Sequence, residues 1–192
     1  MTIGLSGDTR HSYAERGDDL YETPACATEA LLRAEKLPKR IWEPACGPGA
    51  IVRVLRAAGH DAWATDLIDY ESADQDESDC DFLFAWDSYG HPAIVTNPPY
   101  KLAAEFVENG LKLVPKVIML LRLSFLESER RSKILDGGML ARVHVFRKRL
   151  PMMHRHGWTG PKSSSGVTHA WFVWDREHKG PTELHRISWE AS

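Results

Sequence analysis

Cysteine is scarce in this chain of 192 residues, and its three cysteines, Cys26, Cys46 and Cys80, form no C-x-x-C pair. An odd number of widely spaced cysteines predicts neither a disulfide framework nor a thiolate zinc site. No apolar run approaches the roughly 20 residues of a membrane-spanning helix, so we expect no membrane segment. Residues 1–19 also lack the apolar centre of a secretory signal, which favours a cytoplasmic protein with a flexible N-terminal segment.

The chain has no overall basic charge, since its formal net charge is -3, but its charges are segregated. Residues 66–81 include eight acidic side chains and no Lys or Arg, whereas residues 122–162 hold ten Lys or Arg against three acids. The first segment repels phosphate and the second attracts it, which indicates a nucleic-acid partner at the second segment. An interpretation in which both segments are only solvated surface stays open at this point.

Helical periods alternate with short β-branched runs along the chain, which indicates βαβ units and a parallel sheet covered by helices. The length favours one domain, residues 20–192. In the first helix we expect Thr23 as the N-cap and Pro24 at the first helical position. The predicted helices span residues 24–35, 49–58, 102–113 and 127–135.

Seven strands are expected from the same pattern, over residues 40–43, 61–65, 82–84, 93–96, 117–121, 142–146 and 169–174. The last two are joined by a long loop, residues 147–168, that has no helical pattern. We therefore expect these two strands to pair as an antiparallel hairpin. Because loops of this length in compact domains often serve function, we interpret it as a substrate-binding loop.

A glycine-containing turn, residues 43–49 (Glu-Pro-Ala-Cys-Gly-Pro-Gly), lies between a predicted strand and a predicted helix, where open α/β sheets bind nucleotide-like ligands. Alone, it would also suit any tight turn. Asp66 ends the next predicted strand 23 residues after Glu43, near the offset of about 20 at which an acid meets ribose hydroxyls. Val52 stands where a dinucleotide motif would have a third glycine. We therefore expect an adenosine-containing ligand without a pyrophosphate.

The tetrapeptide Asn97-Pro98-Pro99-Tyr100 follows the predicted strand 93–96 and so faces the same crevice. Its prolines remove two N–H donors and stiffen the chain, which presents the Asn97 amide and the Pro98 carbonyl as acceptors. Two aligned acceptors suit an NH₂ group whose delocalised lone pair makes it a poor nucleophile. Tyr100 offers an aromatic face on which a flat acceptor can stack. The position at a strand end favours this interpretation over a purely structural turn.

These two motifs, in this order, resemble class I S-adenosylmethionine (AdoMet)-dependent amino-methyltransferases of the N6-adenine type, including compact phage and prophage DNA methyltransferases. The resemblance covers about residues 20–174. It implies an α/β, Rossmann-like, seven-stranded and mostly parallel sheet with helices on both faces and a C-terminal antiparallel hairpin. It also implies AdoMet as the cofactor and residues 97–100 as the catalytic segment, Asn97, Pro98, Pro99 and Tyr100.

The resemblance further implies which residues hold the cofactor. Asp66 would hold the ribose, and Leu67 and Phe82 would flank the adenine. Asp81 would lie near the adenine amino group. The upstream segment with Tyr21 would help to hold the methionine end. The complete implied set is Tyr21, Thr23, Pro24, Glu43, Ala45, Gly47, Gly49, Asp66, Leu67, Asp81, Phe82 and Asn97.

The function that the sequence predicts is methyl transfer from AdoMet to the N6 amine of adenine in DNA. In one alternative, the methyl acceptor is an RNA adenine or a protein glutamine, because Asn-Pro-Pro-Tyr serves flat nitrogens of all three kinds. A second alternative is a non-catalytic AdoMet-fold binding module, against which the intact tetrapeptide counts. The oligomeric state is left open.

The expected nucleic-acid contacts come from the basic segment. No insertion is large enough for a separate target-recognition domain, so loops would have to read any target sequence. We expect no metal, because His154 and His156 have no Cys, Asp or Glu at ligand spacing in that loop. The residues predicted to contact nucleic acid are Arg147, Lys148, Arg149, Arg155, Trp158 and Lys162.

Overall fold

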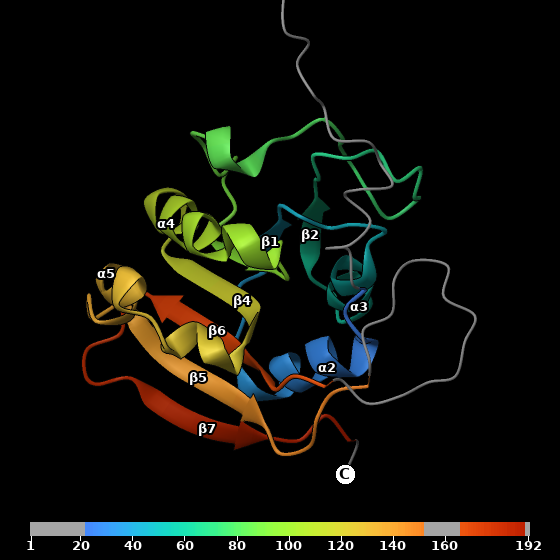
Figure 1. Cartoon of the computed structure of the whole chain (residues 1–192). Helices are drawn as coiled ribbons and strands as arrows, with labels where there is room; N and C mark the ends of the chain where they lie inside the picture. The colour runs from blue at the N-terminus through green and yellow to red at the C-terminus, as the bar shows by residue number, and fades with distance from the viewer. Residues whose placement is uncertain (1–21, 152–165, 191–192) are drawn as a thin grey trace, which may run out of the picture.

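The computed structural model describes residues 22–151 and 166–190, and their strands form one sheet in the order β2-β1-β3-β4-β6-β5-β7 (Figure 1). Among the described strands, β6 alone runs antiparallel to both of its neighbours, β4 and β5. The predicted α/β, Rossmann-like and mostly parallel sheet with an antiparallel hairpin is therefore confirmed. The strands are β1 (Arg40–Glu43), β2 (Asp61–Ala64), β3 (Ala93–Thr96), β4 (Lys116–Arg122), β5 (Leu140–Phe146), β6 (His169–Asp175) and β7 (Glu183–Ile187).

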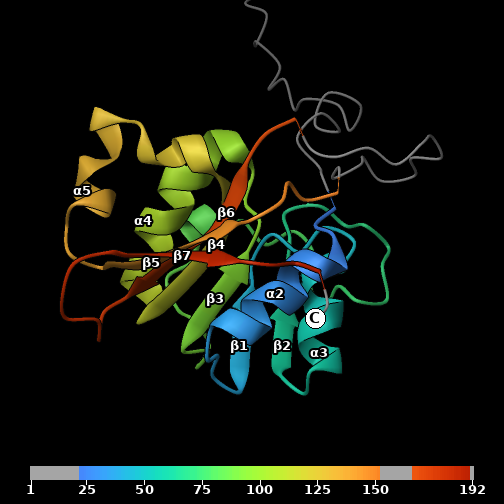
Figure 2. The ribbon, with the colours of Figure 1, turned by 90° about the horizontal axis from the view of Figure 1, so that it is seen from below.

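Helices cover both faces of the sheet, with α2 and α3 on one side and α4 and α5 on the other (Figure 2). Short 3₁₀ turns connect several of the elements. None of the helices within the described ranges is long and apolar enough to cross a membrane. The helical elements are α2 (Ala25–Ala34), α3 (Ala50–Ala57), η1 (Phe82–Phe84), η2 (Tyr100–Leu102), α4 (Ala103–Leu113), η3 (Leu123–Leu126), η4 (Glu129–Arg131) and α5 (Ser132–Leu135).

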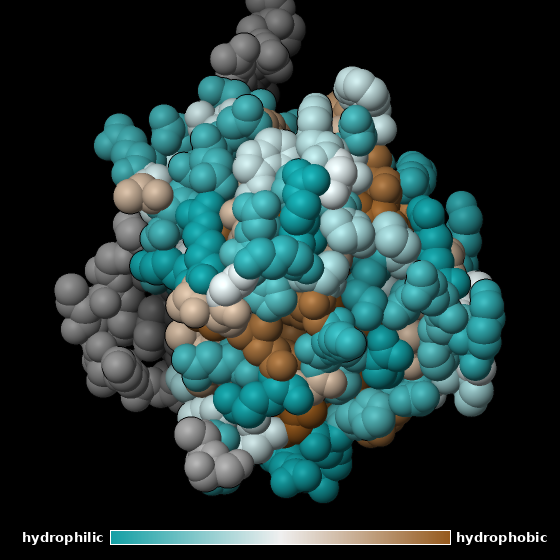
Figure 3. All heavy atoms as spheres, turned by 180° about the vertical axis from the view of Figure 1, so that it is seen from behind, coloured by the Kyte–Doolittle hydropathy of each residue, from teal (hydrophilic) through white to brown (hydrophobic). Residues whose placement is uncertain are grey.

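Strand β4 shows why the sheet needs a cover on each face. Its side chains alternate, so that Ile118 and Leu120 join the core under α2 and α3, while Val117, Met119 and Leu121 join the core under α4 and α5. A central strand that is buried on both faces has a nearly continuous apolar sequence, as β4 does. The outer surface, seen from behind in Figure 3, is mostly hydrophilic, with apolar side chains visible mainly near the middle of that face.

Two of the sequence predictions for secondary structure are wrong and one element was missed. Residues 82–84 form the 3₁₀ turn η1 rather than a strand, because the Asp81 carboxylate accepts the Leu83 N–H at 3.0 Å and turns the chain. The predicted helix 127–135 is reduced to η4 and the four-residue α5. Strand β7 was missed because its largely exposed sequence Glu-Leu-His-Arg-Ile carries no apolar signal. The sheet therefore has the expected seven strands, but β7 takes the place of the predicted strand 82–84.

The start of the first helix also differs from the expectation. Pro24 is itself the N-cap, with extended backbone angles, and its carbonyl accepts the Ala27 N–H at 2.9 Å. Thr23 does not cap the helix, since its hydroxyl accepts a hydrogen bond from Asn97 instead. Some predicted features lie outside the described residues: the segment 1–19, Tyr21, and the loop residues His154, Arg155, His156, Trp158 and Lys162.

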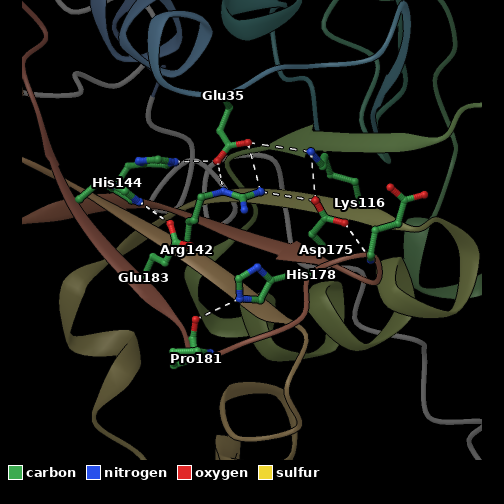
Figure 4. A network of polar contacts seen from close by, with 10 residues as sticks. Glu35, Lys116, Arg142, His144, Asp175, His178, Pro181 and Glu183 are labelled. Carbon is green, nitrogen blue, oxygen red and sulfur yellow. Dashed lines mark hydrogen bonds and ion pairs between the residues drawn. The ribbon is translucent and has the colours of Figure 1, made fainter.

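A buried network of charges joins α2 to the amino ends of β4 and β5, on the side of the sheet away from the parallel strands' carboxyl ends (Figure 4). The Glu35 carboxylate accepts hydrogen bonds from Arg142 and, at 2.8 Å, from His144. Asp175 pairs with Lys116 at 3.2 Å and with Arg142 at 3.4 Å. Burial alone would raise the pKa of Glu35, but hydrogen bonds from His144 and Arg142 outweigh it and hold that pKa below its ordinary value.

Replacing Glu35 with Gln should destabilise the fold by about 3 kcal/mol at pH 7, because Arg142 loses its buried carboxylate partner and keeps only the partly buried Asp175. A lowered pKa means that the stabilisation is present above the ordinary Glu pKa of about 4.3 and is lost as the pH falls through the folded value. Urea denaturation should therefore show a smaller difference in unfolding free energy between the wild type and Glu35→Gln at pH 3.5 than at pH 7. Glu29→Gln, on the exposed side of the same helix, is the control. If Glu29→Gln and Glu35→Gln lowered the stability equally at pH 7, the stabilising role assigned to Glu35 would be wrong.

Candidate active site

A cavity of about 320 Å³ lies at the carboxyl ends of β1, β2 and β3, the edge at which open α/β sheets bind ligands. Its volume falls at the lower end of the range for small-molecule sites. The two motifs singled out in the sequence both line it. The lining residues that the sequence predicted are Thr23, Glu43, Ala45, Gly47, Asp66, Leu67, Asp81, Phe82, Asn97, Pro98, Pro99 and Tyr100.

The Asp66 carboxylate connects the end of β2 to the glycine turn. Its Oδ2 accepts the Gly47 N–H at 2.9 Å and its Oδ1 accepts the Ile68 N–H at 3.0 Å. Burial raises the pKa of this carboxyl, although the backbone donors from Gly47, Ile68 and Leu67 act against the rise. The acid therefore lines the cavity, held in place by the backbone on both sides.

Glycine is required in the turn by the backbone. Gly47 and Gly49 have φ values of 53° and 91°, a region that other residues rarely adopt. A Cβ on Gly49 would also lie 2.3 Å from the Cβ of Asp74. Gly49 does not line the cavity, nor does Pro24, so these two predicted cofactor residues shape the surrounding backbone instead.

Glu43, at the end of β1, is 1% exposed and lines the cavity. Burial raises the pKa of its carboxyl well above the ordinary value, and a hydrogen bond from the Val52 N–H opposes that rise. Its Oε2 has no hydrogen-bond partner among the described residues. A buried carboxyl oxygen without a partner is costly, so this atom suits a donor or a cation brought by a ligand.

The Asn97 side chain is oriented by Thr23, which lies just before α2. Its Nδ2 donates to the Thr23 hydroxyl at 3.2 Å, a contact between residues 74 positions apart. The strand before it, β3, is buried throughout, and Pro98 is buried as well. The tetrapeptide is thus anchored in the core on one side while its residues line the cavity on the other.

The Tyr100 ring is contacted by two residues from neighbouring strands. Its hydroxyl lies 3.1 Å from Nε2 of His169, and the Arg122 guanidinium carbon lies 4.3 Å from its ring centre. His169 is buried, and burial followed by the charge of Arg122 lowers the pKa of His169 to about 4. Neither contact was anticipated from the sequence.

On the opposite wall, Phe82 is buried against Trp42 and Phe106, with ring centres 5.3 and 4.8 Å away. Leu67 is half exposed at the cavity. This wall is apolar and could cover a flat ring system. Further lining residues were not named as cofactor contacts from the sequence. Three of them, Pro44, Cys46 and Pro48, belong to the glycine turn, and no motif marks the others: Glu22, Ala50, Ile51, Ile68, Tyr70, Cys80, Leu83, Leu102 and Phe106.

The basic segment is only partly available to a ligand. Arg147, Lys148 and Arg149 are exposed after β5, but Lys148 pairs with Glu190 at 2.8 Å. Arg142 is committed to the buried network described above. Within residues 22–151 and 166–190, no group of three or more His, Cys, Asp or Glu side chains is arranged to hold a metal ion.

A seven-stranded, mostly parallel sheet with one antiparallel strand, β6, and a cavity at the carboxyl ends of its parallel strands is a Rossmann-like fold. No family model and no curated protein matches the sequence. Among solved structures, a candidate RNA methyltransferase from Pyrococcus horikoshii aligns with a TM-score of 0.61 at 13% identity, over 89% of this chain and 93% of that one.

Two further structures have the same fold. The modification subunit of a candidate type I restriction enzyme from Vibrio vulnificus aligns with a TM-score of 0.59 at 11% identity, over 88% of this chain and 47% of that one. The 23S rRNA methyltransferase ErmE aligns with a TM-score of 0.55 at 16% identity, over 82% of this chain and 69% of that one. At these identities the likeness establishes the fold.

The geometry of the glycine turn can be tested by comparing two glycines with nearly equal φ. Gly59→Ala, at φ 89° with nothing within 4 Å of the added Cβ, should cost about 1 kcal/mol of stability from backbone strain. Gly49→Ala adds the contact with Asp74 and should cost about 3 kcal/mol. Urea denaturation measures both. Equal losses for the two variants would mean that Asp74 does not pack over the turn.

Proposed function

We propose that this protein transfers a methyl group from AdoMet to the N6 amine of adenine in nucleic acid, with DNA as the first candidate. The observation that carries the proposal is that the tetrapeptide 97–100, residues 43–48 of the glycine turn and Asp66 line one cavity. A motif suited to activating an NH₂ group thus stands beside a motif suited to an adenosine ligand.

The residues of the cavity fit AdoMet on three counts. Asp66 lines the cavity, and its carboxylate could accept hydrogen bonds from ribose hydroxyls. The apolar wall that contains Phe82 could cover an adenine. The Oε2 of Glu43, without a partner among the described residues, suits the ammonium group of the methionine end. When bound, AdoMet would supply an electrophilic methyl group. A cation beside Glu43 would also favour the ionised carboxylate, against the burial that raises its pKa.

The chain's own contribution to the chemistry is to orient and activate the acceptor amine. The Asn97 amide oxygen and the Pro98 carbonyl would accept its two N–H groups, which raises the electron density on the nitrogen. Thr23 holds the nitrogen end of the Asn97 amide, so that end is directed away from the acceptor. Tyr100 would stack on the base after it has left the helix stack.

Nucleic acid is favoured as the acceptor by two observations. Arg147 and Arg149 are exposed and close in sequence, so they can meet phosphates of one strand. The structural neighbours include a candidate RNA methyltransferase and an rRNA methyltransferase. Arg155, Trp158 and Lys162 are proposed as further contacts to nucleic acid. An RNA adenine and a protein glutamine are the competing acceptors, since each presents a flat NH₂ group to the same tetrapeptide.

Asp66→Ala should weaken the binding of AdoMet and of its demethylated product at least tenfold. The ribose hydroxyls would lose a charge-assisted hydrogen bond worth roughly 1.5–3 kcal/mol, and 1.4 kcal/mol is tenfold in affinity. Isothermal calorimetry measures both affinities. Because Asp66 also holds the backbone of Gly47 and Ile68, Asp66→Asn should lose less affinity than Asp66→Ala. Asp69→Ala, outside the cavity lining, serves as the control. Wild-type affinity in Asp66→Ala would remove the ribose assignment.

Asn97→Ala should retain AdoMet binding but lose methyl transfer by about 100-fold or more, because an acceptor aimed at developing charge is comparable to an oxyanion-hole donor. The assay follows labelled methyl groups from AdoMet into separate pools of DNA, RNA and protein. Label in DNA that depends on Asn97 supports the proposal. Label in RNA alone, or in protein alone, would move the assignment to the corresponding alternative. A folded variant with the wild-type rate would exclude Asn97 from the chemistry.

A further inference from the structure

The side chain of Tyr100 is held at two points by residues that no motif marks. The guanidinium of Arg122 lies over its ring, with the central carbon 4.3 Å from the ring centre. The imidazole of His169 meets its hydroxyl at 3.1 Å. One contact fixes a face of the ring and the other fixes its far end, so together they oppose rotation about both side-chain bonds.

The two holding residues are themselves fixed relative to each other by the sheet. Arg122 ends β4 and His169 begins β6, and they are direct cross-strand partners. The pairing continues one step further, since the Leu123 N–H donates to the Thr168 carbonyl at 2.9 Å. Residues directly opposite on antiparallel strands keep a constant spacing, so the pair presents its two groups to Tyr100 as a unit.

The two residues differ in environment. His169 is 4% exposed, whereas Arg122 is exposed. Burial, and then the neighbouring charge of Arg122, lowers the pKa of His169 to about 4, so the imidazole is neutral at pH 7. The contact with Tyr100 therefore comes from a neutral imidazole, and the positive charge lies on the ring-facing Arg122.

We propose that Arg122 and His169 are positioning residues that fix the Tyr100 ring in the cavity wall in the orientation on which the acceptor base stacks. This inference rests on the proposed function. A ring that is already fixed does not lose side-chain freedom when the base arrives, and that saving appears as affinity for the acceptor. The two preceding prolines stiffen the backbone, while Arg122 and His169 complete the same task for the side chain.

Kinetics with DNA and labelled AdoMet test the role. Tyr100→Phe, which keeps the ring but removes the hydroxyl contact, and Arg122→Gln should each raise the KM for DNA about three- to tenfold. Arg122→Gln should do so with kcat and AdoMet affinity nearly unchanged. Lys36→Gln, which removes an exposed charge just after the C-terminal end of α2, is the control for charge alone. His169→Gln extends the series if it folds, and Tyr100→Phe carries the test if it does not.

A double-mutant cycle separates positioning from a direct contact between Arg122 and phosphate. In a Tyr100→Ala background, Arg122→Gln should have no further effect on KM if it acts through the ring. A direct phosphate contact would instead persist in that background and would lower the magnitude of the salt slope by about 0.9. A further rise of the KM in the Tyr100→Ala background, or a salt slope lowered by Arg122→Gln, would overturn the positioning role.

An acceptor-free measurement keeps this inference distinct from the proposed function. NMR spectra are recorded on protein labelled with ¹³C at the tyrosine ζ position. The Tyr100 resonance is assigned as the one that disappears in Tyr100→Phe. Arg122→Gln should shift it and Lys36→Gln should not. A shift without methylation of DNA or RNA would remove the proposed function and leave the contacts on Tyr100 standing. An unshifted resonance in an enzyme that methylates DNA would overturn the positioning role and leave the function standing.

Discussion

The site depends on one carboxylate that ties two loops together. Asp66 follows the end of β2. Its carboxylate accepts the N–H of Gly47 in the glycine turn and the N–H of Ile68 in its own loop. The neighbouring Thr65 carbonyl accepts the Cys46 N–H at 3.0 Å, which joins the same two segments through the backbone. With these bonds, the turn after β1 and the loop after β2 form one rigid wall, and the remaining walls of the cavity are built against it.

The second half of the cavity depends on contacts across long stretches of sequence. Asn97 is oriented by Thr23, and Tyr100 is contacted from β4 and β6. The sheet makes this possible because β3 and β4 run parallel side by side while β6 returns antiparallel to β4. The carboxyl end of β4 and the start of β6 therefore meet beside the tetrapeptide. The single antiparallel strand thus contributes a residue to the site as well as closing the core.

The sequence predicted what local patterns encode and missed what only tertiary pairing creates. The run Ala-Ile-Val-Thr of β3 and the glycine turn were identified because strand length, apolarity and glycine position are local signals. Residues 82–84 were misassigned because three residues cannot distinguish a strand from a turn, and the deciding bond comes from Asp81. His169 and Arg122 could not be linked to Tyr100 at all, since their proximity follows from strand register.

The acidic segment 66–81 shows how a charge run can serve structure. It contains no regular strand, and its one bridge to β2's end is Thr65 with Glu77. Its carboxylates accept backbone N–H groups where a sheet would have supplied carbonyls: Asp69 from Glu71 at 2.8 Å and Asp76 from Ala64 at 2.8 Å, for example. Asp76 is also paired with Arg56 at 2.6 Å. The ion pair with Arg56 therefore offsets part of the negative charge of this segment, so the sequence total overstates the repulsion that a nucleic acid would meet beside the cavity.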